Sequence, residues 1–152
     1  MQVWTFLHIV AMFAAVSLVV GGEIFALEAG RRRDVGALRA YFRLSSSLER
    51  LSTLALVAGI AFGLTAAVVG GLNLLQGWLV LAYVLVAGGI VVGAATAPAF
   101  NRLRVAVETN RGDDAGPELD QLLKSPLPYL LVTISIAFLV AIVWVMVFKP
   151  TF

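Results

Sequence analysis

Two ionisable side chains at the first apolar run are the residues best placed to do chemistry. His8 is the only histidine, and it lies in a stretch, residues 1–22, without Asp, Glu, Lys or Arg; Glu23 follows directly. Along a helix, the interval from His8 to Glu23 corresponds to a rotation of about 60° and a rise of about 22 Å. The two side chains can therefore share a helix face, but they cannot form an acid–base pair.

The imidazole of His8 has two possible uses. It can ligate a heme iron or relay a proton, or it can hydrogen-bond a carbonyl group or water near the membrane interface. With one histidine in the chain, bis-histidine heme ligation needs a second subunit, and a three-histidine zinc or copper site within one chain is excluded. Heme is the cofactor that a ligand role for His8 suggests.

Glu23 also has two interpretations. An acid inside a bilayer is costly, and such residues often bind a proton or cation during transport. Alternatively, Glu23 can extend toward the headgroups or pair with an arginine of the loop that follows.

Catalytic constellations are not evident. A serine triad needs a histidine beside the nucleophile, and His8 has no serine within one helical turn. The remaining acids fall in polar loops rather than as paired carboxylates of a cleft. No Gly-x-x-x-x-Gly-Lys phosphate loop is present, and cysteine is absent. We predict no catalytic residue and a non-enzymatic protein.

The elements that carry these residues follow from composition. Hydrophobic residues make up 61% of the 152 residues and charged ones 13%, and charges are also missing from residues 51–101 and 125–148. Crossing a bilayer takes about 20 apolar helical residues. We predict an all-α polytopic membrane protein, a single four-helix transmembrane domain over residues 1–152. Its helices should span about 3–27, 48–69, 78–100 and 127–148.

Short amphipathic segments should connect the membrane helices. Apolar residues recur at helical spacing over 35–44, which predicts an interfacial helix. Ser45–Ser47 should interrupt it, and Ser46 with Glu49 resembles a capping box that begins the second membrane helix. Residues 117–123 can form a small surface helix after Pro117.

The basic residues predict the orientation. Ten of the eleven Lys and Arg residues fall in loops 28–50 and 101–126, which the positive-inside rule assigns to the cytoplasm. We expect a bacterial plasma (inner) membrane protein with both termini outside. The basic residues flank apolar segments rather than forming one polar face, so nucleic acid is not an expected partner. The arginines expected to fix the topology and attract anionic lipid headgroups are Arg31, Arg32, Arg33, Arg102 and Arg104.

Small residues indicate where helices can pack. Gly59 and Gly63 lie four apart on the second helix, as do Gly89 and Gly93 on the third. This spacing lets helix backbones approach closely in lipid. We expect a tight core from the first three helices, with the fourth peripheral. The same glycines are compatible with a homodimer or with packing against other membrane subunits.

Several short motifs resemble a known group. Phe6-Leu7-His8-Ile9-Val10, Leu48-Glu49-Arg50-Leu51, Gly77-Trp78-Leu79 and Phe148-Lys149-Pro150 are similar to the layout of small four-helix membrane families. These include the copper-resistance-D-like proteins, the HemJ type of protoporphyrinogen oxidase and uncharacterised relatives. The resemblance implies a heme or porphyrin ligand at His8. The Trp and Arg after the histidine in the HemJ type, and the lysine after the third-helix Trp, have no counterpart here.

Three hypotheses follow. The first is a membrane module that binds heme or a porphyrin-like ligand through His8, within a redox assembly. The second is a structural accessory subunit of a membrane complex. The third is a small proton- or cation-coupled transporter that uses Glu23.

Overall fold

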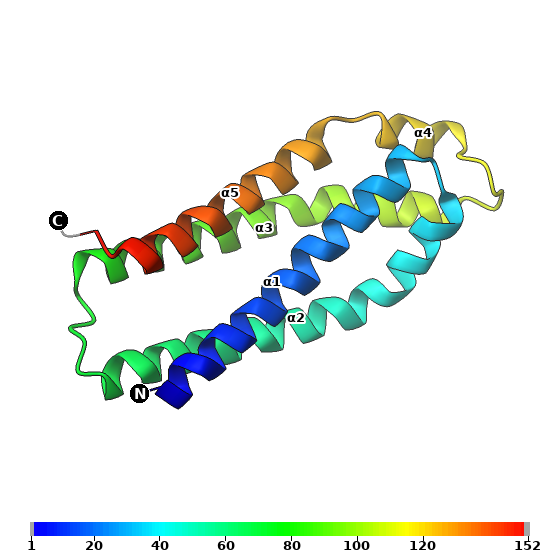
Figure 1. The fold of residues 1–152 in the computed structure, drawn as a ribbon. Helices are drawn as coiled ribbons and strands as arrows, with labels where there is room; N and C mark the ends of the chain where they lie inside the picture. Colours follow the sequence, from blue (N-terminus) through cyan, green and yellow to red (C-terminus); the bar gives the residue numbers. More distant parts are fainter. Residues whose placement is uncertain (1, 151–152) are drawn as a thin grey trace.

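The computed structural model describes residues 2–150, and within them every element is helical (Figure 1). The helices are α1 (Gln2–Arg31), α2 (Val35–Val69), α3 (Gly77–Thr109), α4 (Pro117–Leu123) and α5 (Leu127–Phe148). Four segments are long and apolar enough to cross a membrane: α1, α2, α3 and the stretch comprising α4 and α5. The predicted all-α polytopic membrane fold is confirmed.

The helices extend further at the basic end than hydropathy predicted. The interfacial segment 35–44 is not a separate helix but the beginning of α2, so the interruption at Ser45–Ser47 and the capping box at Ser46 were wrong. The cap is Asp34, whose Oδ1 accepts a hydrogen bond from the Ala37 N–H at 2.8 Å. Ser45 is compatible with the helix because its hydroxyl donates a hydrogen bond to the carbonyl of Phe42 at 3.0 Å. The hydroxyl group therefore has a partner within its own helical turn.

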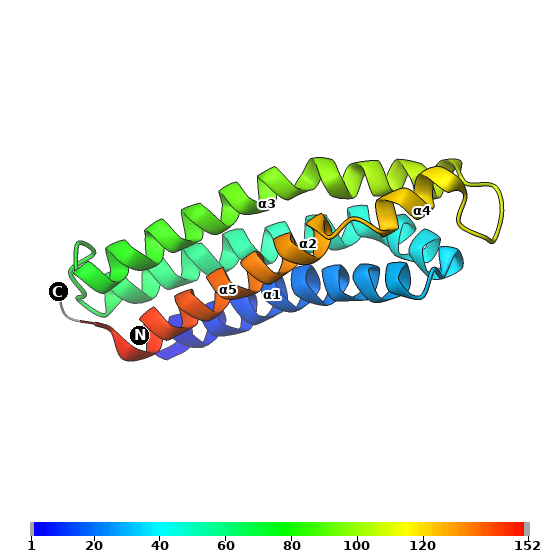
Figure 2. The same cartoon turned by 90° about the horizontal axis from the view of Figure 1, so that it is seen from above.

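The bundle is built from two helix pairs. α1 packs mainly on α2, and α3 packs mainly on α5, and Figures 1 and 2 show each pair running side by side. A Cβ on Gly88 would lie 2.8 Å from Cε1 of Phe138, so α3 and α5 approach closely there. The expected three-helix core with a peripheral fourth helix was therefore wrong.

The buried core lies at one end of the bundle. Its largest members come from the beginning of α2, the end of α3 and α4, and Leu119 of α4 is only 2% exposed. An ion pair of 2.9 Å between Arg33 and Asp120 holds α4 across this cluster. The buried residues are Ala29, Val35, Leu38, Phe42, Leu103, Ala106, Val107 and Leu119.

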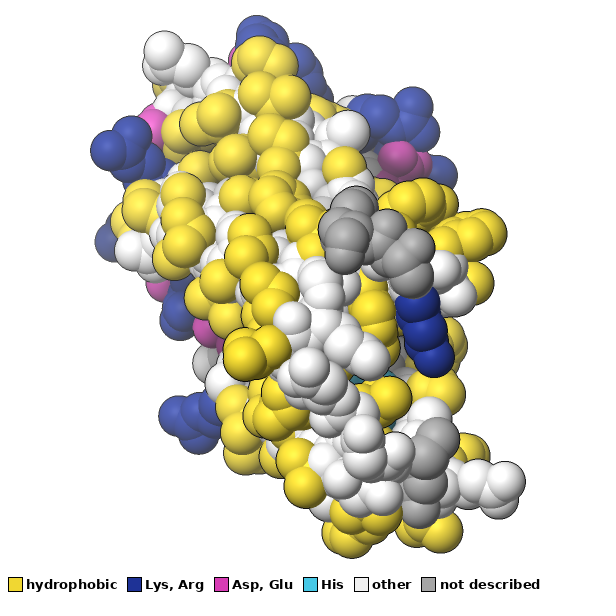
Figure 3. Space-filling model, turned by 90° about the vertical axis from the view of Figure 1, so that its left-hand side faces the viewer, with side chains coloured by type: hydrophobic (Ala, Val, Ile, Leu, Met, Phe, Trp, Pro, Cys, Tyr) yellow, Lys and Arg dark blue, Asp and Glu magenta, His cyan; other side chains and the backbone are white. Residues whose placement is uncertain are grey.

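The two ends of the bundle differ in polarity. The beginning of α1 and the end of α5 lie at the same end of the bundle, and the arginine-rich connections lie at the other (Figure 1). Viewed from the end with the termini, the surface is mostly apolar, and most of the Lys and Arg side chains lie along its margins (Figure 3). Many large apolar side chains are exposed around the bundle, including Phe13, 74% exposed, and Val147, 67%. Such a surface is suited to lipid.

Candidate intramembrane binding site

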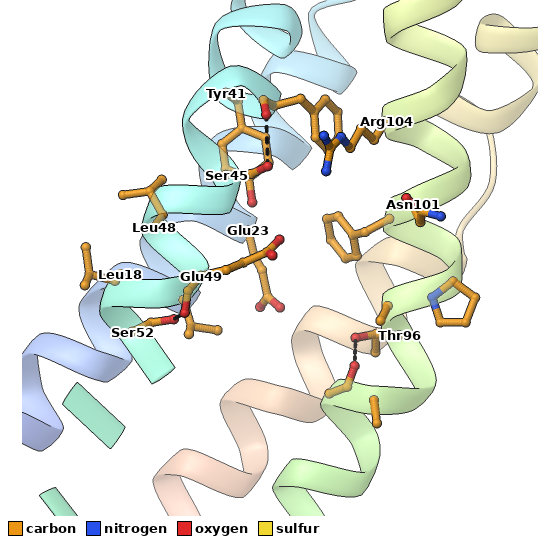
Figure 4. Close-up of a pocket in the computed structure, with 17 residues that line it drawn as sticks. Leu18, Glu23, Tyr41, Ser45, Leu48, Glu49, Ser52, Thr96, Asn101 and Arg104 are labelled. Carbon is orange, nitrogen blue, oxygen red and sulfur yellow. Dashed lines mark hydrogen bonds between the residues drawn. The ribbon is translucent and has the colours of Figure 1, made fainter. Parts of the chain in front are cut away.

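A groove of about 730 Å³ lies between the two helix pairs, toward the basic end. Its walls come from α1, α2 and α3. Polar side chains line one part of it: Glu23 of α1, Tyr41 and Glu49 of α2, and Asn101 and Arg104 of α3 (Figure 4). The rest is mostly apolar, with Leu18, Val19, Ala94 and Ala97 among the lining residues.

The helix directions bring Glu23 and Glu49 toward each other. Every side chain on an α-helix tilts toward the N-terminus of its own helix, and α1 and α2 run in opposite directions (Figure 1). Glu23 therefore leans away from the basic end and Glu49 leans toward it. Figure 4 shows both side chains extending into the space in front of α3. The groove thus holds two carboxyl groups from two helices.

The surroundings of the two carboxyl groups differ. Oε2 of Glu23 is buried and has no hydrogen-bond partner within the described part of the chain, whereas Glu49 is exposed at the mouth of the groove. A buried acceptor without a donor costs free energy. Glu23 is therefore the group in this groove that has most to gain from a bound proton or cation.

Tyr41 and Arg104 complete the polar part of the groove. The Tyr41 ring lies against Gly22, where a Cβ would be 3.3 Å from its Cε2, and it is within electrostatic range of Glu23 and Glu49. Nε of Arg104 donates to Glu108 at 2.8 Å, and Arg104 also interacts electrostatically with Glu49. Because Glu108 neutralises Arg104, the balance of charge at the groove is negative.

His8 lines neither this groove nor the smaller cavity between Ala26 of α1 and Tyr129 of α5. Its Nδ1 is 2.7 Å from the carbonyl oxygen of Gly59, and since a carbonyl only accepts, Nδ1 carries the proton. The structure thus places His8 in the contact between α1 and α2. The hydrogen bond leaves Nε2 as the free ring nitrogen.

The glycines differ in what they contact. A Cβ on Gly59 would lie 2.6 Å from Sδ of Met12, and one on Gly63 would lie 2.7 Å from Nδ1 of His8. A Cβ on Gly89 or Gly93 would meet no atom within 4 Å. The first pair lies where α1 approaches α2, and the second faces open space.

Some of the arginines of the basic end pair with nearby acids. Arg31 and Arg32 pair with Glu28 at 2.8 and 2.6 Å. Arg102 is exposed. Within residues 2–150, no group of three His, Asp or Glu side chains is placed to hold a metal ion.

Sequence analysis found Glu23 but missed its partners on α2. Glu49 was interpreted as part of a helix cap, which excluded it from the candidate ligands. A signal was present: Tyr41, Ser45, Glu49 and Ser52 are spaced by four, four and three residues, which places them on one helix face. A row of polar residues along one face of a membrane helix is compatible with a cavity or a protein contact, although Arg43 and Arg50 between them weaken this signal.

Comparison with known proteins identifies the family of the chain. No curated protein and no solved structure matched the chain, and nothing linked it to the copper-resistance-D-like or HemJ-type groups, so that finer resemblance stays a prediction. Residues 2–150 match the family described as predicted integral membrane protein DUF2269. The chain therefore belongs to DUF2269, a family of integral membrane proteins.

Proposed function

We propose that this protein binds a proton or a cation at Glu23, within the membrane, as part of a small proton- or cation-coupled transporter. The observation that carries the proposal is the buried Oε2 of Glu23, which has no hydrogen-bond donor among residues 2–150 although it lines a groove of about 730 Å³. An isolated carboxylate is expensive in an apolar environment, so it is neutralised or paired. Proton or cation binding supplies that neutralisation reversibly.

The arginines of the following loop are engaged with other acids. Arg31 and Arg32 pair with Glu28, and Arg33 pairs with Asp120. Glu23 has no ion pair within the described residues. Pairing with an arginine of the loop therefore does not explain the acid at Glu23. This favours the transport hypothesis.

Proton flux in reconstituted vesicles tests the proposal. Vesicles that contain the purified protein and a trapped pH-sensitive dye receive an acid pulse, and the rate of internal acidification is measured. We expect the wild type to accelerate acidification over protein-free vesicles and Glu23→Gln to abolish the acceleration. Glu28→Gln is the matched control on the same helix, because Glu28 lies at the exposed end with its arginines. Flux that persists in Glu23→Gln contradicts the proposal.

Heme or porphyrin binding through His8 is a second candidate. It is supported by the hydrogen bond from Nδ1 to Gly59, since metal-ligating histidines donate their other ring N–H in this way. The absorption spectrum of the purified protein, recorded before and after dithionite and with added hemin, tests it. A Soret band that is lost in His8→Ala supports the candidate, and a featureless visible spectrum contradicts it.

Association with a second copy or another membrane subunit is a further proposal. It is supported by the open space at Gly89, where an added Cβ would meet no atom within 4 Å; Gly93 instead lines the groove. The chain has no cysteine, so a single Gly89→Cys variant reports on a homodimer by disulfide cross-linking in native membranes. Absence of a cross-linked dimer contradicts a homodimer through this face.

For orientation, we propose a bacterial plasma membrane, both termini outside and loops 28–50 and 101–126 in the cytoplasm. The support is that the basic connections gather at one end of the bundle (Figure 1), as the positive-inside rule requires. Single cysteines at Gly112 and Gln76 distinguish the two sides through a membrane-impermeant maleimide applied to intact cells. We expect labelling of Gln76→Cys alone. Labelling of Gly112→Cys alone would indicate the opposite orientation.

A further inference from the structure

The groove is much larger than a bare ion requires. Its volume of about 730 Å³ falls within the range of about 300–1,000 Å³ that is typical of small-molecule sites. A water molecule, by comparison, occupies about 30 Å³ in the liquid. A proton or a metal ion at Glu23 leaves most of this space to be filled by something else.

The groove is open on the side between α2 and α3. These helices meet mainly through the buried cluster at the basic end, where Phe42 and Leu103 lie. Beyond the cluster, the lining residues Glu49, Ala94 and Ala97 are exposed. In a bilayer this open side faces the hydrocarbon chains, so a molecule that reaches the groove by this route must itself be lipophilic.

The charges in the groove favour a positively charged ligand. Glu23 and Glu49 supply two carboxyl groups, and the only cation among the lining residues, Arg104, is already paired with Glu108 at 2.8 Å. Aromatic side chains lie beside the carboxyl groups, and the Tyr41 and Phe42 rings are 5.1 Å apart, centroid to centroid. Aromatic faces attract cations that have left water behind.

We propose that the groove binds a lipophilic organic cation. Its charged centre lies between Glu23 and Glu49, near the Tyr41 ring, and its apolar part extends along Leu18 and Ala94. The inference rests on the proposed function, because that proposal assigns Glu23 as the charged site, and it adds the chemical class of the ligand.

The order of the charges along the bundle disfavours a phospholipid in the groove. Arg104 lies five residues before the end of α3 and Glu23 lies eight before the end of α1, which is about 7.5 Å and about 12 Å of helix at 1.5 Å per residue. A phospholipid with its phosphate at Arg104 would direct its outer headgroup toward water, away from Glu23. The deeper carboxyl groups suit a molecule whose only charge is positive.

Equilibrium binding of tritiated tetraphenylphosphonium to the detergent-purified full chain tests the inference. We expect saturable binding to the wild type, at least a tenfold loss of affinity in Glu23→Gln and a smaller loss in Glu49→Gln. Glu28→Gln, with its side chain outside the groove, should bind as the wild type does. Undiminished binding in Glu23→Gln, or no binding to the wild type, overturns the inference.

Carbodiimide labelling of the wild type separates this inference from the proposed function and needs no variant. Dicyclohexylcarbodiimide modifies protonated carboxyl groups in apolar surroundings, and mass spectrometry locates the modified residue. Labelling of Glu23 that tetraphenylphosphonium slows supports both proposals. If tetraphenylphosphonium leaves the labelling of Glu23 unchanged, the organic-cation ligand is overturned, while Glu23 remains a proton site. Absence of labelling at Glu23 counts against the proposed function. A phospholipid that co-purifies and is not displaced by tetraphenylphosphonium also overturns the inference.

Discussion

Replacing Gly63 with alanine should destabilise the protein through His8. The added Cβ would lie 2.7 Å from Nδ1 and 2.9 Å from Cε1 of the His8 ring, closer than atoms in van der Waals contact. The ring cannot move away freely, because Nδ1 donates to the Gly59 carbonyl at 2.7 Å. Either the imidazole gives up this hydrogen bond or α1 moves away from α2.

The expected cost follows from three contributions. Overpacking of a close contact costs about 1–3 kcal/mol, and an interhelical hydrogen bond in a membrane protein contributes about 0.6 kcal/mol, up to about 1.7. Alanine recovers up to about 1 kcal/mol of helix propensity relative to glycine. We therefore expect Gly63→Ala to lower the free energy of unfolding by about 1–3 kcal/mol.

Denaturant titration in mixed micelles, followed by circular dichroism, measures this change. Gly21→Ala is the matched control, because Gly21 is on α1 and a Cβ there would meet no atom within 4 Å. It should leave stability unchanged or raise it slightly. In a His8→Ala background the cost of Gly63→Ala should shrink, since the two residues are in contact and their effects are coupled. Equal stability of Gly63→Ala and Gly21→Ala refutes the reasoning.

Two further predictions concern the groove and the basic end. The affinity for tetraphenylphosphonium should fall as the pH is lowered, because a proton that binds the Glu23 carboxylate removes negative charge from the groove; an affinity that is constant with pH contradicts carboxylate binding. Leu119→Ala should cost about 2–5 kcal/mol, as expected for a buried leucine, since Leu119 is 2% exposed. The released α4 should speed trypsin cleavage at Arg111 in the preceding loop, and an unchanged cleavage rate would show that α4 does not depend on this contact.

The membrane helices could be predicted from sequence because each must be apolar over the bilayer thickness and satisfy its own backbone. Hydropathy does not indicate where a helix ends once it leaves the hydrocarbon. For this reason α2 was expected to begin near residue 48, whereas it begins at Val35. Ser45 and Ser46 suggested a break, yet a serine hydroxyl that bonds a carbonyl of its own helix leaves the helix intact.

Helix pairing was the least predictable part of the fold. The two glycine pairs, Gly59–Gly63 and Gly89–Gly93, have the same spacing in the sequence. In the structure only the first pair lies close to another helix. Gly88, adjacent to the second pair, is the residue that contacts α5 through Phe138. Which face of a helix meets which neighbour depends on shape complementarity between helices, and one sequence does not encode that in a short motif.

The candidate site was predictable for Glu23 and not for its surroundings. An acid in an apolar helix stands out in any sequence, whereas Glu49 is near the expected end of a helix and attracts no notice by itself. The structure joins them because α2 begins at Val35, so that Glu49 lies within the helix rather than at its cap and faces the groove opposite Glu23 (Figure 4). The groove is therefore a consequence of the length of α2.

Infrared difference spectroscopy across a pH titration tests the central claim most directly. A protonated carboxylic acid in an apolar site has a C=O stretching band separate from those of the amide groups and of ionised carboxylates. We predict such a band in the wild type, its loss in Glu23→Gln, its retention in Glu28→Gln and its decrease when tetraphenylphosphonium binds. A band that is the same in wild type and Glu23→Gln would mean that Glu23 does not hold the proton, and the account of the groove would be contradicted.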